Sequence, residues 1–190
     1  MSVVTNYLNR RGIELDEEEL ARALDQLLGE HLVAEESARL TKQAEEVLER
    51  VAPRPRNRAV VEATAATVAE SIELVSTSRS VETVAGGLGL DPSRIRHRVS
   101  DGSLHALRVG RRLLLPAWQF SPDGAPLPSL GAVIGALPAD LHPLEIAAFM
   151  TSPHPELQVR GRALSPAKWL AGGGDPAPVI ALAESLAVPA

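Results

Sequence analysis

Aromatic residues are scarce in this chain, and that scarcity restricts the kind of core it can build. Of the 190 residues only 3% are aromatic, whereas 45% are hydrophobic. The core must therefore come mostly from Leu, Val, Ile and Ala, a composition that favours helices over aromatic-rich β-sandwiches. The chain has no cysteine, which excludes a disulfide scaffold, a thiolate metal site and a thiol nucleophile. We expect a mainly α fold.

The apolar pattern also bears on localisation. The sequence contains no run of about 18 apolar residues, the length that a membrane-spanning helix needs. The N-terminal stretch MSVVTNYLNRRG lacks the apolar segment of a signal peptide. We therefore expect a cytoplasmic protein with no membrane partner.

The net charge of −5 is unevenly distributed along the chain. Residues 1–57 carry a net charge of −4, residues 58–78 carry −2 and residues 121–190 carry −3. Residues 79–120, in contrast, contain seven basic and three acidic groups. A basic segment within an acidic chain is typical of a small nucleic-acid-binding module. The alternative is a solvated face without a partner.

The first 78 residues are expected to form a helical region. The spacing of apolar residues predicts helices over about residues 15–28, 33–51 and 58–75. The first two helices are amphipathic and have little to bury against within this region. We interpret them as a helical hairpin through which two copies of the chain dimerise. The rest of the chain divides into residues 79–120 and 121–190, because prolines become frequent after residue 120.

Residues 80–100 have the pattern of a helix-turn-helix. A short helix is expected over residues 81–86, followed by a turn in which Gly89 can adopt a positive φ. Asp91 and Pro92 then supply the N-cap and the first residue of a second helix. A helix, a tight turn with glycine and a helix with a polar first turn together define the motif.

The second helix of this motif combines an apolar face with a cationic one. Ile95 and Val99 lie four residues apart and are expected to face the core. Arg94 and Arg98, also four apart, share another face with His97. Because arginine can pair bidentately with guanine or hold phosphates, the cationic face is suited to DNA.

A β-hairpin is expected directly after the second helix. Its strands cover about residues 104–109 and 113–115, and Gly110, Arg111 and Arg112 join them. Pro116 ends the second strand, where its missing N–H does no harm. A hairpin with two arginines at its tip, placed after a helix-turn-helix, has the character of a wing.

The three consecutive stretches SVETVAGGLGL, DPSRIRHRVSDGSLHALRVG and RRLLLPAWQF, residues 80–120, resemble the winged helix-turn-helix of the excisionase and MerR-like DNA-binding family. The resemblance implies that the second helix contacts DNA and that Arg111 and Arg112 reach the backbone or the minor groove. The candidate DNA-binding residues are Ser93, Arg94, Arg96, His97, Arg98, Arg108, Arg111 and Arg112. The alternative is a winged domain that contacts only protein.

Residues 121–190 are expected to form a small helical domain. Short helices fit between the prolines at about residues 129–136, 143–150, 166–171 and 176–186. Ser165 and Asp175 are suited to cap the last two helices, each with a proline directly after the cap. No repeat with a period of 20–50 residues is apparent.

The end of the chain contains Ser165-Pro166, Trp169-Leu170, the glycine run 172–174, Asp175-Pro176, Val179 and Leu182-Ala183. This combination is similar to the toxin-binding domain of Xre/ParS-type antitoxins. It implies binding of a protein toxin encoded beside this chain, either an NAD-consuming RES-type enzyme or a nuclease. Many members of that family carry a different DNA-binding region, or none, upstream. The alternative is that Trp169 is only a core residue.

The candidate toxin-binding residues are Trp169, Leu170, Gly173, Asp175, Pro176 and Val179.

No catalytic, metal-binding or cofactor-binding residues are predicted. The five histidines lack metal-ligand spacing, and no serine lies in a nucleophile elbow. The resulting hypothesis is a non-enzymatic antitoxin that neutralises its toxin and, as a homodimer, binds double-stranded operator DNA to repress its own operon. One alternative is a stand-alone transcription or recombination-directionality factor whose C-terminal region oligomerises. The other is a structural adaptor whose wing binds protein.

Overall fold

The computed structural model describes residues 21, 67, 69–109 and 111–187 of the chain. The predicted helices over residues 15–28 and 33–51, and with them the dimerisation hairpin, lie outside the described residues. Within the described part the fold is mainly α, as the composition predicted. It also contains two small antiparallel sheets. No helix in this part is long and apolar enough to span a bilayer.

The first described elements form a winged helix-turn-helix. Residues 69–77 are helical and lead into β1 (Arg79–Ser80), α5 (Val81–Leu88) and α6 (Pro92–Ser100). The hairpin follows as β2 (Leu107–Val109) and β3 (Arg112–Leu115), and a 3-10 helix, η1 (Ala117–Gln119), ends the unit. The strand order is β1-β3-β2, all antiparallel, so β1 adds a third strand that the sequence did not predict.

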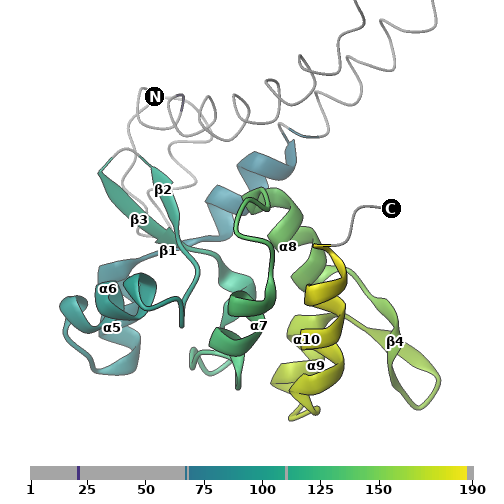
Figure 1. Ribbon diagram of the computed structural model, residues 1–190. Coiled ribbons are helices and arrows are strands. Elements are labelled where there is room, and N and C mark those ends of the chain that lie inside the picture. The colour runs from purple at the N-terminus through teal and green to yellow at the C-terminus, as the bar shows by residue number, and fades with distance from the viewer. Residues whose placement is uncertain (1–20, 22–66, 68, 110, 188–190) are drawn as a thin grey trace, which may run out of the picture.

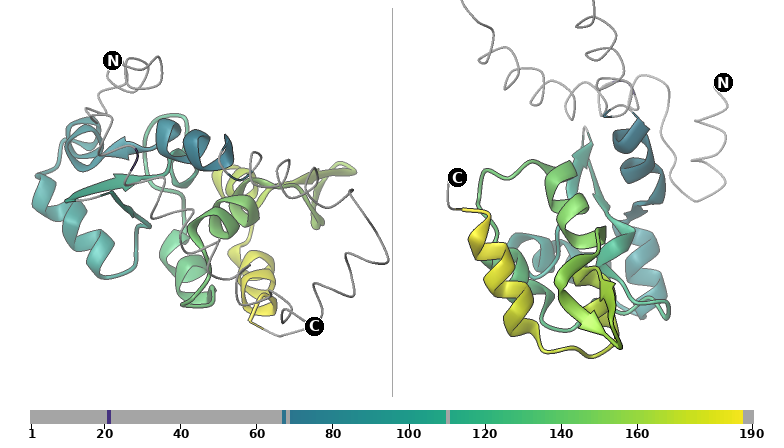
Figure 2. Two further views of the ribbon diagram at one scale, coloured as in Figure 1. Left: turned by 90° about the horizontal axis from the view of Figure 1, so that it is seen from above. Right: turned by 90° about the vertical axis from the view of Figure 1, so that its right-hand side faces the viewer.

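The C-terminal part contains four helices and a second hairpin. The helices are α7 (Leu130–Ala136), α8 (Pro143–Thr151), α9 (Pro166–Ala171) and α10 (Pro176–Ser185), close to the predicted ranges. The strands β4 (His154–Val159) and β5 (Arg162–Leu164) pair between α8 and α9. The prediction of a purely helical region is therefore incomplete. Figure 1 shows this hairpin at the end of the molecule opposite α5 and α6, and Figure 2 agrees.

One continuous core joins the winged unit to the C-terminal helices. Ile95 of α6 and Leu115 of β3 belong to the same buried cluster as Val133 of α7, Met150 of α8 and Val179 of α10. A second cluster places Leu74 and Val75, from the helix over residues 69–77, against the hairpin β2–β3. The helix over residues 69–77, which precedes the wing in sequence, therefore packs against one face of it.

Three predicted boundaries differ from the structure. The helix before β1 continues to Thr77, two residues beyond Val75, and the Thr77 hydroxyl donates to Glu73 O at 2.8 Å. The first wing strand begins at Leu107, not Leu104, since Leu104 N–H donates to Arg98 O at the end of α6. Arg112 belongs to β3 and not to the loop.

Candidate nucleic-acid interface

The helix α6 is held in place by a capped entry and one buried anchor. Gly89 adopts a left-handed conformation, with φ at 63°, and ends α5. Asp91 caps α6 by accepting a hydrogen bond from Ser93 N at 2.8 Å, and Pro92 occupies the first turn. Hydrogen bonding from the Ser93 side chain, and then from its backbone N–H, lowers the pKa of Asp91 because it favours the charged carboxylate. Ile95 is completely buried and fixes the helix on the core.

All eight candidate DNA-binding residues are exposed. Ser93, Arg94, Arg96, His97 and Arg98 lie on α6, as predicted, while Arg108 lies on β2 between two buried residues. Arg111 lies in the turn of the hairpin and Arg112 at the start of β3. The fold therefore brings together one helix and one hairpin, each with exposed arginines.

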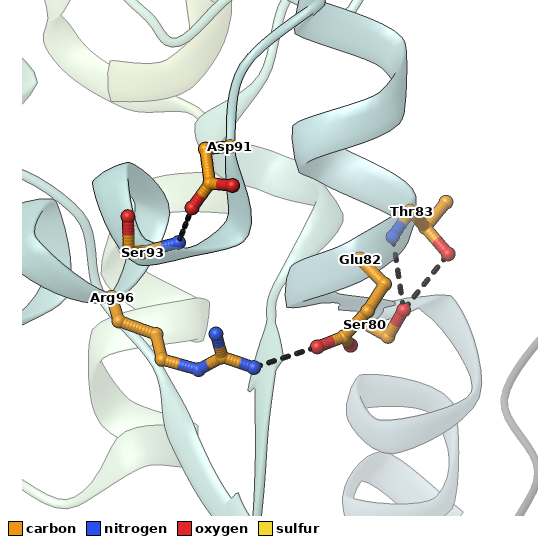
Figure 3. A network of polar contacts seen from close by, with 6 residues as sticks. All are labelled: Ser80, Glu82, Thr83, Asp91, Ser93 and Arg96. Atoms are coloured by element: carbon orange, nitrogen blue, oxygen red, sulfur yellow. Dashed lines mark hydrogen bonds and ion pairs between the residues drawn. The ribbon is translucent and has the colours of Figure 1, made fainter.

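Arg96 makes an ion pair that the sequence analysis missed. Its guanidinium donates to Glu82 Oε1 on α5 at 2.7 Å (Figure 3). Both side chains stay more than half exposed, at 54% and 64%, so the pair contributes about 0–1 kcal/mol to stability. In this pair the Arg96 side chain is directed towards α5. Arg94 and Arg98 are therefore better placed than Arg96 to contact a DNA ligand.

The end of α6 is held by hydrogen bonds to Asp101. Asp101 Oδ1 accepts from Ser103 N at 2.9 Å and from Ser103 Oγ at 2.6 Å, and these bonds lower the pKa of Asp101. His97 Nε2 lies 3.8 Å from Asp101 Oδ2, with the imidazole 79% exposed. The loop that connects the helix to the wing thus has a defined path.

Gln119 and His105 form the base of the wing. Gln119 is completely buried, and its Oε1 accepts from His105 N at 3.0 Å while its Nε2 donates to His105 O at 2.8 Å. The His105 ring stacks on Trp118, with 6.0 Å between the ring centroids. Among the described residues, neither His105 Nε2 nor Trp118 Nε1 has a hydrogen-bond partner. The side-chain amide of Gln119 thus forms two hydrogen bonds with the backbone of His105, as a neighbouring β-strand would.

Stability should depend on pH through His105. Burial lowers the pKa of His105, since the charged imidazolium is disfavoured there. Below about pH 6.5 the unfolded chain therefore binds the proton more readily than the folded chain, and the free energy of unfolding falls as the pH falls towards the lowered pKa. Denaturant titrations of the wild type and His105→Phe between pH 5 and pH 8 measure this effect. An equal pH dependence in both proteins would contradict it.

The six candidate toxin-binding residues all have structural roles within the chain. Trp169 Nε1 donates to Asp175 O at 2.7 Å, and the indole lies against Gly174, where a Cβ would approach Cε2 to 2.5 Å. Leu170 and Val179 are buried in the core. The remaining three, Gly173, Asp175 and Pro176, form a left-handed turn, an N-cap and a first helical turn.

Other candidate chemistry is sparse in the described part of the chain. Within it, no group of three His, Asp or Glu side chains could hold a metal ion. A cleft of about 580 Å³ lies beside Leu74, Trp118 and Leu144, with Glu70 and Glu73 also in its lining. These carboxylates come from the helix that supports the wing, and the lining includes none of the candidate DNA-binding residues.

Comparison with known proteins adds little to this description. No protein-family model matches the chain, and no curated protein matches it. A solved structure described as the NMR structure of Rv2175c is similar to it. The two sequences are 22% identical, the match covers 58% of this chain and 81% of that chain, and the TM-score is 0.45.

Proposed function

We propose that this protein binds double-stranded DNA through α6 and the hairpin β2–β3 and acts as a transcription regulator. The observation that carries the proposal is that α6 has one buried apolar face and one exposed cationic face. Ile95 anchors one face completely in the core, while Arg94, His97 and Arg98 point away from it and are exposed. A helix of this kind can lie in the major groove, where arginine reads guanine or holds phosphates.

The wing supports the same proposal. Arg108 and Arg111 are exposed on a hairpin whose other face rests on Leu74 and Val75. Residues 79–120 carry seven basic and three acidic groups, so the local charge attracts a polyanion although the whole chain is acidic. A winged unit that contacted only protein would have no need of cations on both helix and wing.

Replacing Arg94 and Arg98 together with alanine should weaken DNA binding at least tenfold and reduce the slope of log affinity against log salt by about 1–2. The reason is that each arginine supplies a base-edge or phosphate contact. Fluorescence anisotropy with the upstream region of the protein's own gene measures both quantities. Lys168→Ala is the matched control, because Lys168 is an exposed cation on α9, in the C-terminal part of the fold.

Two results would contradict the proposal. The first is wild-type affinity that does not change with salt. The second is an Arg94→Ala/Arg98→Ala protein that binds as tightly as the Lys168→Ala control. Either result would favour the alternative in which the winged unit binds protein.

The antitoxin function that the C-terminal resemblance implies stays a prediction, as do operator repression and the homodimer. The six candidate toxin-binding residues have roles in the internal structure of α9 and α10, and Gly173 and Asp175 are also exposed, so they stay candidates for a toxin contact. Co-purification with the product of the adjacent gene is the direct test. A stand-alone regulator would show DNA binding and no such complex.

A further inference from the structure

The two hairpins of the described fold correspond residue by residue. Residues 107–117 and 157–167, fifty positions apart, both have the pattern Leu-x-Val-x-x-Arg-x-Leu-x-Pro-Ala. In the first hairpin Val109 pairs with Arg112, and in the second Val159 pairs with Arg162. The next pairs, Arg108 with Leu113 and Gln158 with Ala163, also match. The hairpins therefore share one loop length and one register over the two pairs nearest the turn. Beyond these pairs they differ, since Leu114 pairs with Leu107 whereas Leu164 pairs with His154 across a bulge in β4.

The correspondence extends to the elements around each hairpin. The order helix, helix, hairpin, helix describes α5, α6, β2–β3 and η1, and equally α7, α8, β4–β5 and α9. Both α6 and α8 begin with a side-chain N-cap followed by proline, Asp91-Pro92 and His142-Pro143. The second unit differs in having a longer turn between its helices, and α7 packs on α10, whereas α5 packs on α6.

In the second unit, α8 corresponds to α6 but lacks the basic side chains needed to read DNA. In place of the four basic side chains of α6, α8 contains no arginine or lysine, and its only charged residue, Glu145, is engaged in a capping box with His142. Ala147 of α8 lies against the cluster that supports the first wing. This helix cannot enter a groove.

The second hairpin, in contrast, keeps its cations at the tip. Arg160 and Arg162 are exposed. Val159, the last residue of β4 before the turn, is 47% exposed. Arg160 adopts φ of 52° and Gly161 φ of 77°, the two positive values that a type I′ turn needs. Asparagine or glycine is usual at the first position, so an arginine there carries a backbone cost of about 1–2 kcal/mol.

We propose that the hairpin β4–β5 is a second wing, which binds DNA phosphates beyond the contacts of α6 and β2–β3. This inference rests on the proposed function. A phosphate fits the site because the tip offers two guanidiniums and a single exposed apolar side chain, Val159, whereas a protein partner would need a larger apolar patch. Since α8 carries no reading residues, the second unit adds affinity without sequence preference. Figure 1 shows the two hairpins at opposite ends of the described fold, so the second one requires a longer duplex.

The test removes the two charges without removing the turn. The double variant Arg160→Gly/Arg162→Gln is expected to reduce the salt slope of log affinity by about 2 on a duplex of about 30 base pairs, because each phosphate contact contributes about 0.9. On a duplex of about 10 base pairs, one helical turn, the slope should not change. Preference for specific over random sequence should also be unchanged. Arg160→Lys/Arg162→Lys keeps both charges and should retain the wild-type slope.

A gain-of-contact variant makes the test independent of any loss of folding. Gln158 occupies the position that Arg108 holds in the first wing, so Gln158→Arg should steepen the slope by about 0.9 on the long duplex. If the wild type binds no DNA, the proposed function itself fails. If the wild type binds but neither variant shifts the slope on the long duplex, the second wing is overturned while the first stands. Loss of sequence preference in the double variant would also overturn it.

Discussion

Replacing Ile95 with alanine is expected to lower the free energy of unfolding by about 2–5 kcal/mol. Ile95 is completely buried, and it is the one buried residue of α6. Alanine there leaves a cavity beneath a helix of nine residues whose other core contact, Val99, is only partly buried. The loss is a large part of the 5–15 kcal/mol that stabilises an ordinary domain. Urea unfolding followed by circular dichroism measures it.

Ile95→Val is the graded control for this prediction. Valine removes a single methylene and should cost about 0.5–1.5 kcal/mol. Because the cationic face of α6 depends on the same anchor, Ile95→Ala should also weaken DNA binding, although Ile95 is not exposed to the ligand. An Ile95→Ala protein as stable as Ile95→Val would show that α6 is held mainly by its cap and by Arg96–Glu82.

The helix-turn-helix was predictable from sequence because its signals are local. Asp91, Pro92 and Gly89 act within one turn of the backbone, and each has the cap or the left-handed conformation that its residue type favours. The same reasoning places Ser165 and Asp175 as caps of α9 and α10. Short-range chemistry of this kind does not depend on the rest of the fold.

The elements that sequence reasoning missed depend on distant partners. The strand β1 has two residues and exists only because Arg79 and Ser80 pair with Leu115 and Leu114 of β3, 36 and 34 positions later. The pair Glu82–Arg96 joins two helices, and nothing in the spacing of either residue indicates it. Such contacts follow from the packing of the fold and have no periodic signal.

The second hairpin and the internal correspondence were missed for a different reason. The prolines at positions 153 and 155 favoured a loop at the start of β4. This strand also has a bulge between His154 and Gln158. The offset between the two units also changes, from 51 residues at the proline that opens α6 and α8 to 50 at the hairpins. A search for a sequence repeat of constant period therefore detects only the short pattern shared by the two hairpins.

The candidate toxin-binding residues illustrate the limit of motif reasoning. The unusual spacing of Trp169, Gly174 and Asp175 is explained by one contact, in which the indole packs on a glycine and donates to a backbone carbonyl. These residues therefore have a structural role whether or not a toxin binds, and the exposed Gly173 and Asp175 stay candidates for a toxin contact. A complex with the product of the adjacent gene is the evidence that would decide it.

Replacing Gln119 with leucine is expected to lower the free energy of unfolding by about 2–5 kcal/mol. Leucine has a similar size, so the change removes two hydrogen bonds while filling most of the space. The N–H and C=O of His105 are then left without their partner in a part-buried position, at a cost of about 1–3 kcal/mol for each group. The wing should also lose its fixed position, because these bonds hold the chain between α6 and β2.

Gln158→Leu is the matched control for this substitution. It is the same chemical change on an exposed hairpin, where Gln158 makes one hydrogen bond, from Nε2 to Pro155 O at 2.7 Å. Its effect should stay within about 0.5 kcal/mol. Thermal and urea unfolding of both variants give the comparison, and hydrogen exchange at His105 N–H reports the local loss directly. Equal stabilities for the two variants would mean that the wing is positioned by packing on Leu74 and Val75 and not by Gln119.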